Sequence, residues 1–278
     1  MRVVDRAEPG DQLALIAMPG PLTVGPTTDA DVIRKAIGGI GGKRVDAPRS
    51  KFNISGSEAA TLKGRSSISV SEIVNRECRM TDPTCKQEVL EAGSIIADAL
   101  ERQGILTIDG LHGVLDTIAG APGRKLVFVV SAGLPTTNQA GGRPNLAAET
   151  ERIARRAAAA NVNLYVFYLN VHFMQHFSAA TGWRSPSALY EDISMFGSGL
   201  ERFADSAGGG FFQVEVDSDP FVDRAFRETA AAYLLGVQPE AAEFDGKEHQ
   251  IRVSVSRRGL TVRFRRFVVI PVPSSGVG

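Results

Sequence analysis

Residues 123–135, Gly-Arg-Lys-Leu-Val-Phe-Val-Val-Ser-Ala-Gly-Leu-Pro, decide the fold of this chain. An unbroken apolar run ends there in small residues and a proline. This pattern predicts a strand that is buried on both faces, as in the middle of a parallel sheet. In open α/β sheets, ligands bind beyond the carboxyl ends of such strands. At that position the chain has Ala132, which offers a ligand no polar side-chain atom.

The composition is that of a globular protein, and its charges balance. The chain has 278 residues, of which 43% are apolar and 22% charged, enough for one large domain or two small ones. Its 31 basic and 31 acidic side chains cancel, so no electrostatic argument favours nucleic acid or an anionic membrane as a partner. No apolar run is long enough to span a membrane, and residues 1–6 carry no signal-peptide core.

The two cysteines point to an oxidising compartment. Cys78 and Cys85 are the only cysteines, and they flank a short loop, Arg-Met-Thr-Asp-Pro-Thr. Such a pair predicts a disulfide, although two free thiols in a flexible loop are the alternative. A structural zinc site is not expected, because no second pair completes four ligands.

Strand-like and helix-like segments alternate along the chain. Apolar runs predict strands, with a weak one around 21–24 and the others at 11–18, 126–130, 163–169, 211–216 and 233–237. Periodic segments predict helices at 28–37, 86–100, 107–118, 146–160, 200–206 and 218–231. This order predicts a Rossmann-like, doubly wound, mostly parallel sheet with helices on both faces. Residues 249–256 and 260–267 alternate apolar and polar side chains, which predicts a C-terminal β-hairpin.

We expect most of the chain to form one domain. Residues 1–240 form the α/β domain in this interpretation, residues 241–270 add the hairpin that packs on it, and residues 271–278 form a disordered tail. Residues 46–85 are rich in Ser, Arg, Gly and Lys with little periodicity, which predicts a long surface insertion. A second irregular stretch covers residues 172–186.

Several segments, taken in order, resemble the von Willebrand factor type A family, and within it bacterial proteins described as VWFA-related. The resemblance covers about residues 9–267. It rests on Pro-Gly-Asp-Gln-Leu-Ala-Leu-Ile at 9–16, Pro-Gly-Arg-Lys-Leu-Val-Phe-Val-Val-Ser-Ala-Gly at 122–133, Ala-Ala-Asn-Val-Asn-Leu-Tyr-Val at 159–166, Leu-Glu-Arg-Phe-Ala-Asp-Ser-Ala-Gly-Gly at 200–209, Ala-Tyr-Leu-Leu-Gly-Val-Gln-Pro at 232–239 and Arg-Arg-Gly-Leu-Thr-Val-Arg at 257–263.

Two departures from the family concern its metal-ion-dependent adhesion site. The Asp-x-Ser-x-Ser motif that ends the family's first strand does not occur before Asp11. Where the family usually has Thr-Asp-Gly or Ser-Asp-Gly, this chain has Ser131, Ala132 and Gly133, and only Thr107 matches another position of the site. A hard divalent cation needs several oxygen ligands, so the resemblance implies a degenerate site without metal or other cofactor.

The resemblance also implies that the family's first strand is missing. That strand lies between those at 11–18 and 126–130, which must pair directly or leave a gap. A gap would leave few packing partners for Leu13, Leu15, Val127 and Val129. We therefore expect the start codon to lie upstream, with a signal peptide and this strand, and the protein to be periplasmic or extracellular.

Other residue patterns suggest chemistry but fit simpler interpretations. His172 and His176 have the spacing of two metal ligands on a helix, yet they follow a strand directly and lack a metalloprotease glutamate. The segment 38–43, Gly-Gly-Ile-Gly-Gly-Lys, follows a helix, whereas a phosphate-binding loop follows a strand. Ser131 lacks a Gly-x-Ser-x-Gly context for catalysis with His112 or His249.

A basic group in the predicted hairpin could bind an anionic partner, or could form a solvated face. Its members are Arg257, Arg258, Arg263, Arg265 and Arg266. Balancing carboxylates at Glu240, Glu243 and Asp245 favour the solvated face.

These observations favour a non-catalytic module that binds a protein partner or acts as a scaffold. The partner would meet the loops after Val130, Leu169 and Met18. The alternative is a hydrolase or metal-dependent enzyme whose pocket is completed by the insertions at 46–84 and 172–186. A cleft lined by acids and histidines with perturbed pKa values would favour this alternative.

Overall fold

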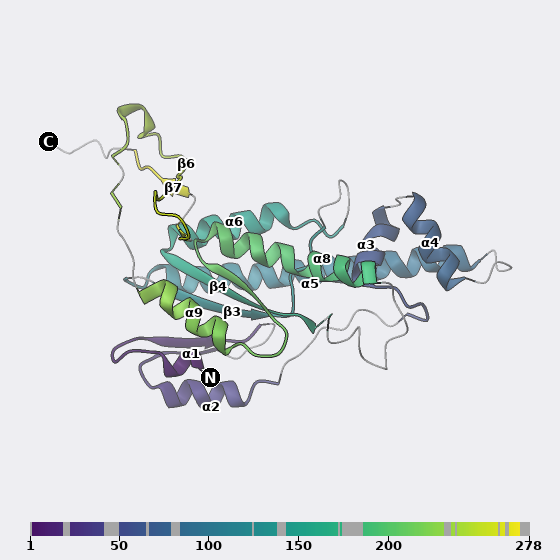
Figure 1. Cartoon of the computed structure of the whole chain (residues 1–278), viewed down its shortest axis with the longest axis horizontal. Coiled ribbons are helices and arrows are strands. Elements are labelled where there is room, and N and C mark those ends of the chain that lie inside the picture. Colours follow the sequence, from purple (N-terminus) through teal and green to yellow (C-terminus); the bar gives the residue numbers. More distant parts are fainter. Residues whose placement is uncertain are drawn as a thin grey trace.

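The computed structural model describes residues 2–18, 23–41, 50–64, 67–78, 84–123, 125–137, 143–171, 173, 186–230, 235–236, 238–260, 262–264 and 267–272. It has a mixed α/β architecture around a three-stranded parallel sheet (Figure 1). None of the helices in these ranges is long and apolar enough to cross a membrane.

The sheet consists of β3 (Lys125–Ser131), β4 (Val162–Leu169) and β5 (Gly210–Val214), in that spatial order. β4 is the central strand, and nearly all its residues are buried because it has neighbours on both sides. The prediction that 126–130 forms a central strand is wrong for the described residues, since β3 pairs only with β4. Both strands are apolar runs, so the sequence alone does not distinguish the edge from the middle.

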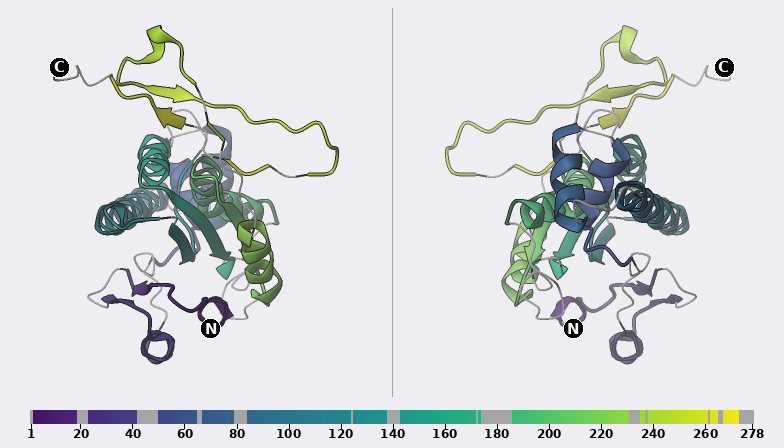
Figure 2. Two further views of the ribbon diagram at one scale, coloured as in Figure 1. Left: turned by 90° about the vertical axis from the view of Figure 1, so that its left-hand side faces the viewer. Right: turned by 90° about the vertical axis from the view of Figure 1, so that its right-hand side faces the viewer.

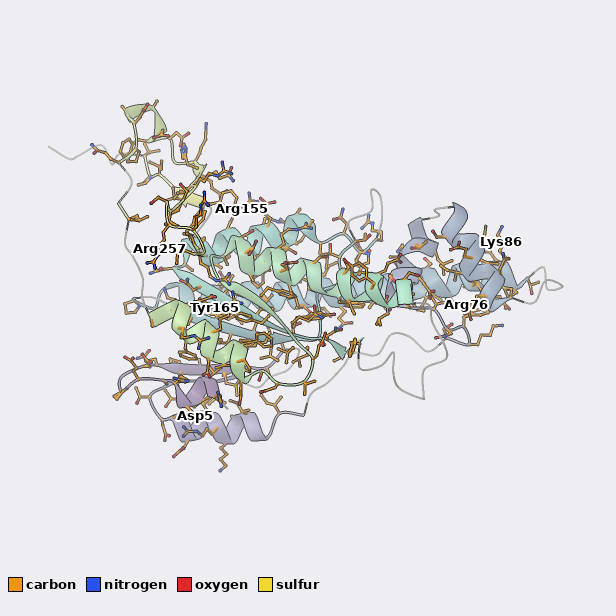
Figure 3. All side chains as sticks on the ribbon, in the orientation of Figure 1. Asp5, Arg76, Lys86, Arg155, Tyr165 and Arg257 are labelled. Atoms are coloured by element: carbon orange, nitrogen blue, oxygen red, sulfur yellow. A yellow bond between two sulfur atoms is a disulfide. The ribbon has the colours of Figure 1, made fainter. Side chains whose placement is uncertain are left out.

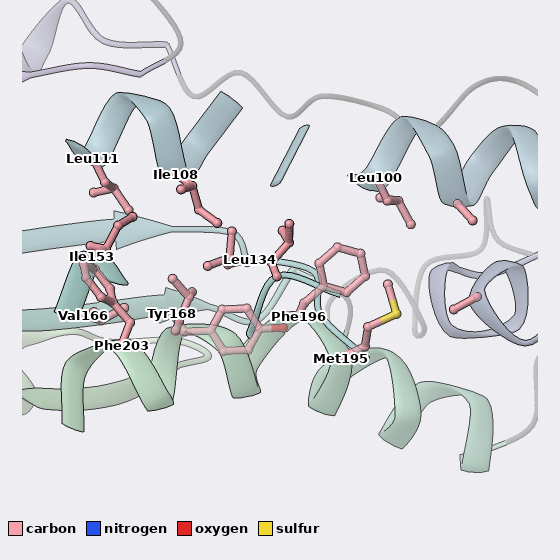
Figure 4. Close-up of a cluster of buried hydrophobic side chains, with 14 of the residues drawn as sticks. Leu100, Ile108, Leu111, Leu134, Ile153, Val166, Tyr168, Met195, Phe196 and Phe203 are labelled. Carbon is pink, nitrogen blue, oxygen red and sulfur yellow. The ribbon is translucent and has the colours of Figure 1, made fainter. Parts of the chain in front are cut away.

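Helices cover both faces of this sheet. On one face, α5 (Cys85–Ala119), α6 (Ala147–Ala159) and α8 (Pro186–Ser206) enclose the larger core cluster (Figure 4). On the other face, α9 (Asp219–Ala230) packs Val222 and Ala225 against aromatic side chains of the strands. The coarse α/β prediction is confirmed.

Two helical predictions are corrected. The segment expected as an irregular insertion at 46–85 contains α3 (Gly56–Gly64) and α4 (Ser67–Glu77), and α3 is buried along most of its length. The helices expected at 86–100 and 107–118 are one continuous helix, α5. A tertiary contact explains why the middle of this helix has a glycine at position 93. There α3 crosses α5, and Leu62 occupies the space that a larger side chain would need.

The N-terminal residues form a separate small unit. It comprises α1 (Arg2–Asp5), the antiparallel strands β1 (Leu13–Ile16) and β2 (Thr23–Thr27), and α2 (Ala30–Gly38). Asp29 caps α2 by accepting hydrogen bonds from the first-turn amides of Asp31 and Val32. Below, this set of elements is called the N-terminal unit.

At the other end of the chain, the hairpin prediction holds only at its base. β6 (Glu248–Gln250) and β7 (Phe267–Val269) pair over three residues after a short 3-10 turn, η1 (Ala241–Glu243). Residues 251–260 form no strand, although their alternation is strand-like. Most of the expected strand at 233–237, and residues 273–278 of the expected tail, lie outside the described residues.

The expected disulfide is present between Cys78 and Cys85, and it joins the end of α4 to the start of α5. Closing this short loop restricts the unfolded chain, so the Cys78→Ser variant should lose about 2 kcal/mol of unfolding free energy. Denaturant titration of both proteins without reductant measures the difference. If wild type and variant unfold at the same denaturant concentration, the bond does not stabilise the fold.

The crossing of α3 and α5 makes a second prediction. A Cβ at Gly93 would approach the Leu62 Cβ to 2.7 Å, whereas one at Gly113 in the same helix would meet nothing within 4 Å. Gly93→Ala should therefore destabilise the protein by about 1–3 kcal/mol through overpacking. Gly113→Ala, the matched control, should stabilise it by up to about 1 kcal/mol through helix propensity. Thermal unfolding that shifts equally in both variants would contradict the close crossing.

Candidate functional site

The outer edge of β3 is the most exposed part of the sheet. Val130 is 66% exposed and Leu126 is 36% exposed, although both lie in the apolar run. Phe128, between them, packs on the face that α9 covers. A strand edge presents unpaired backbone groups as well as side chains, so this edge can accept a further strand.

The ladder to β4 tells which amides of β3 point outward. The Lys125 amide donates to the Asn161 carbonyl across 3.2 Å, at the start of the register. Alternate residues of a parallel strand bond to the same neighbour. The amides that donate to β4 therefore belong to Lys125, Val127, Val129 and Ser131. The amides that face away from β4 belong to Leu126, Phe128 and Val130.

The N-terminal unit lies beyond this edge without joining the sheet. β1 pairs with β2 and forms a separate two-stranded sheet among the described residues. Side chains rather than a ladder attach the unit to the body. Arg2 and Arg6 both form ion pairs with Asp223 of α9, and Val3 packs against the smaller core cluster. Of the two expected arrangements, direct pairing of β1 with β3 is therefore absent from the described part of the chain. The four side chains expected to lack packing partners, Leu13, Leu15, Val127 and Val129, are only partly buried.

The residues of the expected degenerate metal site do not form a ligand set. Ser131 ends β3, and its hydroxyl accepts a hydrogen bond from the Gly133 amide across 3.1 Å. Ala132 is exposed. Thr107 lies inside α5, not at a helix start, and its hydroxyl donates to the Gln103 carbonyl at 3.0 Å. Both hydroxyls therefore satisfy local backbone groups.

A buried polar cluster that the sequence analysis missed lies close to this position. Phe196 of α8 connects the two places, because a Cβ at either Gly56 or Gly133 would come within 3.0 Å of its side chain. The cluster joins α3 to α8 through Asp192, whose carboxylate accepts hydrogen bonds from the Ser55 hydroxyl at 2.9 Å and the Ser57 amide at 2.8 Å.

The same residues cap α3. The Glu58 carboxylate accepts a hydrogen bond from the Ser55 amide, while the Glu58 amide donates to the Ser55 hydroxyl. This reciprocal pair is a capping box, and the Ser-x-x-Glu spacing at 55–58 was the signal in the sequence. Arg76 of α4 then pairs with Glu58, so the cluster holds three helices together.

Burial is the main cause of two shifted pKa values in and beside this cluster. Burial, and then the negative charge of Asp192, raise the pKa of Tyr168. Burial, and then the charges of Asp192 and Glu58, raise the pKa of Glu191. The Tyr168 hydroxyl is fully buried and has no hydrogen-bond partner among the described residues. Because the Asp192 carboxylate anchors the amino end of α3, this arrangement favours a structural role for the cluster.

The other sequence candidates remain apart from this region or undescribed. His172 and His176 lie outside the described residues. His249 contacts Asp245 across 3.1 Å in the C-terminal hairpin. Within the described ranges, three or more potential ligands (His, Cys, Asp or Glu) do not gather into a metal-binding group.

The glycine-rich segment at 38–43 and the basic group of the hairpin have local structural roles in the described residues. Gly39 is the C-cap of α2, and residues 42–43 of the glycine-rich segment lie outside the described part. Of the basic group, Arg263 pairs with Glu228 of α9 and donates to the Gly209 carbonyl, whereas Arg257 and Arg258 are exposed.

Comparison with known proteins yields no relative: no family model matches this chain, and neither the curated proteins nor the solved structures give a match.

The Asp192 anchor makes a testable prediction. Asp192→Ala leaves the buried Ser55 hydroxyl and Ser57 amide without their acceptor, which should cost about 3 kcal/mol of unfolding free energy. Tyr190→Ala, on the same helix and 75% exposed in wild type, should change it by less than about 0.5 kcal/mol. Urea titration measures both. An Asp192→Ala variant as stable as the Tyr190→Ala control would show that the carboxylate does not anchor α3.

Proposed function

We propose that this protein is a non-catalytic interaction module that receives an extended polypeptide segment on the outer edge of β3. The observation that carries the proposal is the exposure of Val130 at the end of an otherwise apolar strand. An edge of this kind binds a partner through main-chain hydrogen bonds and gains specificity from alternate side chains.

The surroundings of the edge suit an apolar, strand-forming segment. Leu126, Phe128 and Val130 lie on one face of β3, because successive side chains of a strand alternate. A bound segment with β-branched residues at alternate positions would cover the exposed Leu126 and Val130. Burying such side chains contributes about 25 cal/mol for each Å² of apolar surface removed from water.

The opposing hypothesis is a hydrolase or metal-dependent enzyme that uses the insertions at 46–84 and 172–186 to complete a pocket. Nearly all of the second insertion lies outside the described residues. In the described part of 46–84, the buried Ser55, Ser57 and Glu58 hydrogen-bond within the α3 cap and to Asp192. That chemistry supports helix packing, and the exposed strand edge therefore favours the module.

The test uses a soluble peptide of alternating valine and lysine as the partner strand. In the free protein, the amides of Leu126, Phe128 and Val130 should exchange hydrogen faster than those of Val127 and Val129, because only the latter two bond to β4. Saturating peptide should slow exchange at the first three amides by at least about tenfold, which corresponds to about 1.4 kcal/mol of protection. Residue-resolved hydrogen exchange by NMR measures both states.

A peptide with proline at its central valine is the matched control, because it cannot continue a ladder. The control should leave all five exchange rates unchanged. Equal exchange of the two sets of amides in the free protein, or no slowing with the alternating peptide, would refute the proposed strand-binding edge.

A further inference from the structure

The net charge of zero conceals an uneven distribution of charge along the chain. Of the 31 basic side chains, six lie beyond Gln250, and all six are arginines. All 31 acidic side chains precede that point. The C-terminal segment is therefore a positive pole on a molecule whose remainder has an excess of negative charge.

Residues 251–260, here called the tip, carry part of this positive charge away from the body. Figure 2 shows the tip as a loop that reaches outward from β6, away from the sheet and its helices. Arg257 and Arg258 lie at the turn of this loop, where Gly259 has a φ of 79°, a conformation that favours glycine. The side chains of Arg252, Arg257 and Arg258 are exposed (Figure 3).

The carboxylates nearest in sequence are engaged by other groups. Glu240 and Glu243 form the capping box of η1, in which each side chain accepts a hydrogen bond from the other residue's amide. Asp245 accepts a hydrogen bond from the Lys247 amide and contacts His249. Among the described residues, no carboxylate pairs with an exposed arginine of the tip, so the positive charge there is not compensated.

Apolar side chains lie beside these charges. Val255 is 47% exposed and Leu260 is 55% exposed, on either side of the arginine pair. The tip has no carboxylate and no aromatic side chain. Arginines beside exposed aliphatic side chains suit a surface that is negatively charged outside and hydrocarbon beneath, because each kind of side chain finds its own layer.

We infer that the tip is a contact site for a lipid surface that carries negative charge. The arginines approach the headgroups, and Val255 and Leu260 enter the boundary between headgroups and acyl chains. Two other anionic partners fit less well. Single-stranded nucleic acid is held largely by stacking on aromatic side chains, which the tip lacks. A stable protein interface takes about 20–30 residues from each side, more than one projecting loop provides.

The remainder of the molecule favours an approach with the tip first. Its excess of negative charge is repelled by the same surface that attracts the arginines, so the two effects orient the protein in one sense. Dissolved salt screens interactions between exposed charges. Binding to anionic lipid should therefore weaken as the salt concentration rises.

Co-sedimentation with phosphatidylcholine vesicles, with and without about one third phosphatidylserine, measures this binding. Wild type should bind the anionic vesicles and not the neutral ones. Arg257→Gln should lower the partition coefficient about fivefold, the factor that one basic side chain near such a surface contributes. Lys86→Gln is the matched control, because it removes an exposed charge at the other end of the molecule, and it should leave binding unchanged (Figure 3).

Leu260→Ser tests the apolar part of the contact at constant charge, and it should lower binding at least about threefold. Each variant should unfold at the temperature of wild type, since the replaced side chains are exposed. The inference fails if wild type does not prefer the anionic vesicles, or if Lys86→Gln weakens binding as much as Arg257→Gln. It also fails if Leu260→Ser binds like wild type, or if a DNA duplex or polyglutamate binds wild type more tightly than the vesicles at equal charge, since the tip would then serve another anionic partner.

Discussion

The two-sided pairing of β4 is the constraint on which the rest of this structure depends. Its side chains alternate between two cores, with Val166 and Tyr168 in the larger cluster and Tyr165 and Phe167 in the smaller one. A strand buried in this way requires neighbours on both edges and helices on both faces. β3 and β5 provide the neighbours, and each is left with one outer edge. The outer edge of β3 is exposed because β3 pairs with β4 on its other side. α9 covers only part of the sheet face beside that edge.

The second constraint is the polar anchor between α3 and α8. A buried carboxylate is costly unless several donors compensate it. Asp192 receives such donors from the start of α3, and Glu58 of the same helix is compensated by Arg76 from α4. The disulfide fixes the end of α4 to α5 nearby. Polar and covalent links thus assemble a helical layer whose sequence has little amphipathic periodicity, which is why those residues suggested an irregular surface insertion.

What the sequence predicts well are elements whose local pattern and tertiary environment agree. The strand at 163–169, the helix capped by Asp29 and the cysteine pair all belong to this class. The sequence analysis fails where a distant contact overrides a local signal. Thr107 resembles a helix start but continues α5, and Val130 resembles a core residue but lies at an edge. At the candidate site, the apolar run of β3 was evident, but its exposure was not, because edge position depends on the order of strands and not on their composition.

The two edges of the parallel sheet are a consequence of its small size. A parallel sheet of three strands has two edges, and here they are treated differently. On the β5 side, Arg263 of the C-terminal hairpin region lies beside Gly210 and donates to the Gly209 carbonyl. On the β3 side, the N-terminal unit is held by ion pairs to α9 and leaves the outer edge of β3 without a ladder partner in the described residues. Exposed apolar edges promote association unless charges or covering elements prevent it. Among the described residues no strand covers the β3 edge, which is why the proposed partner strand is assigned to that side.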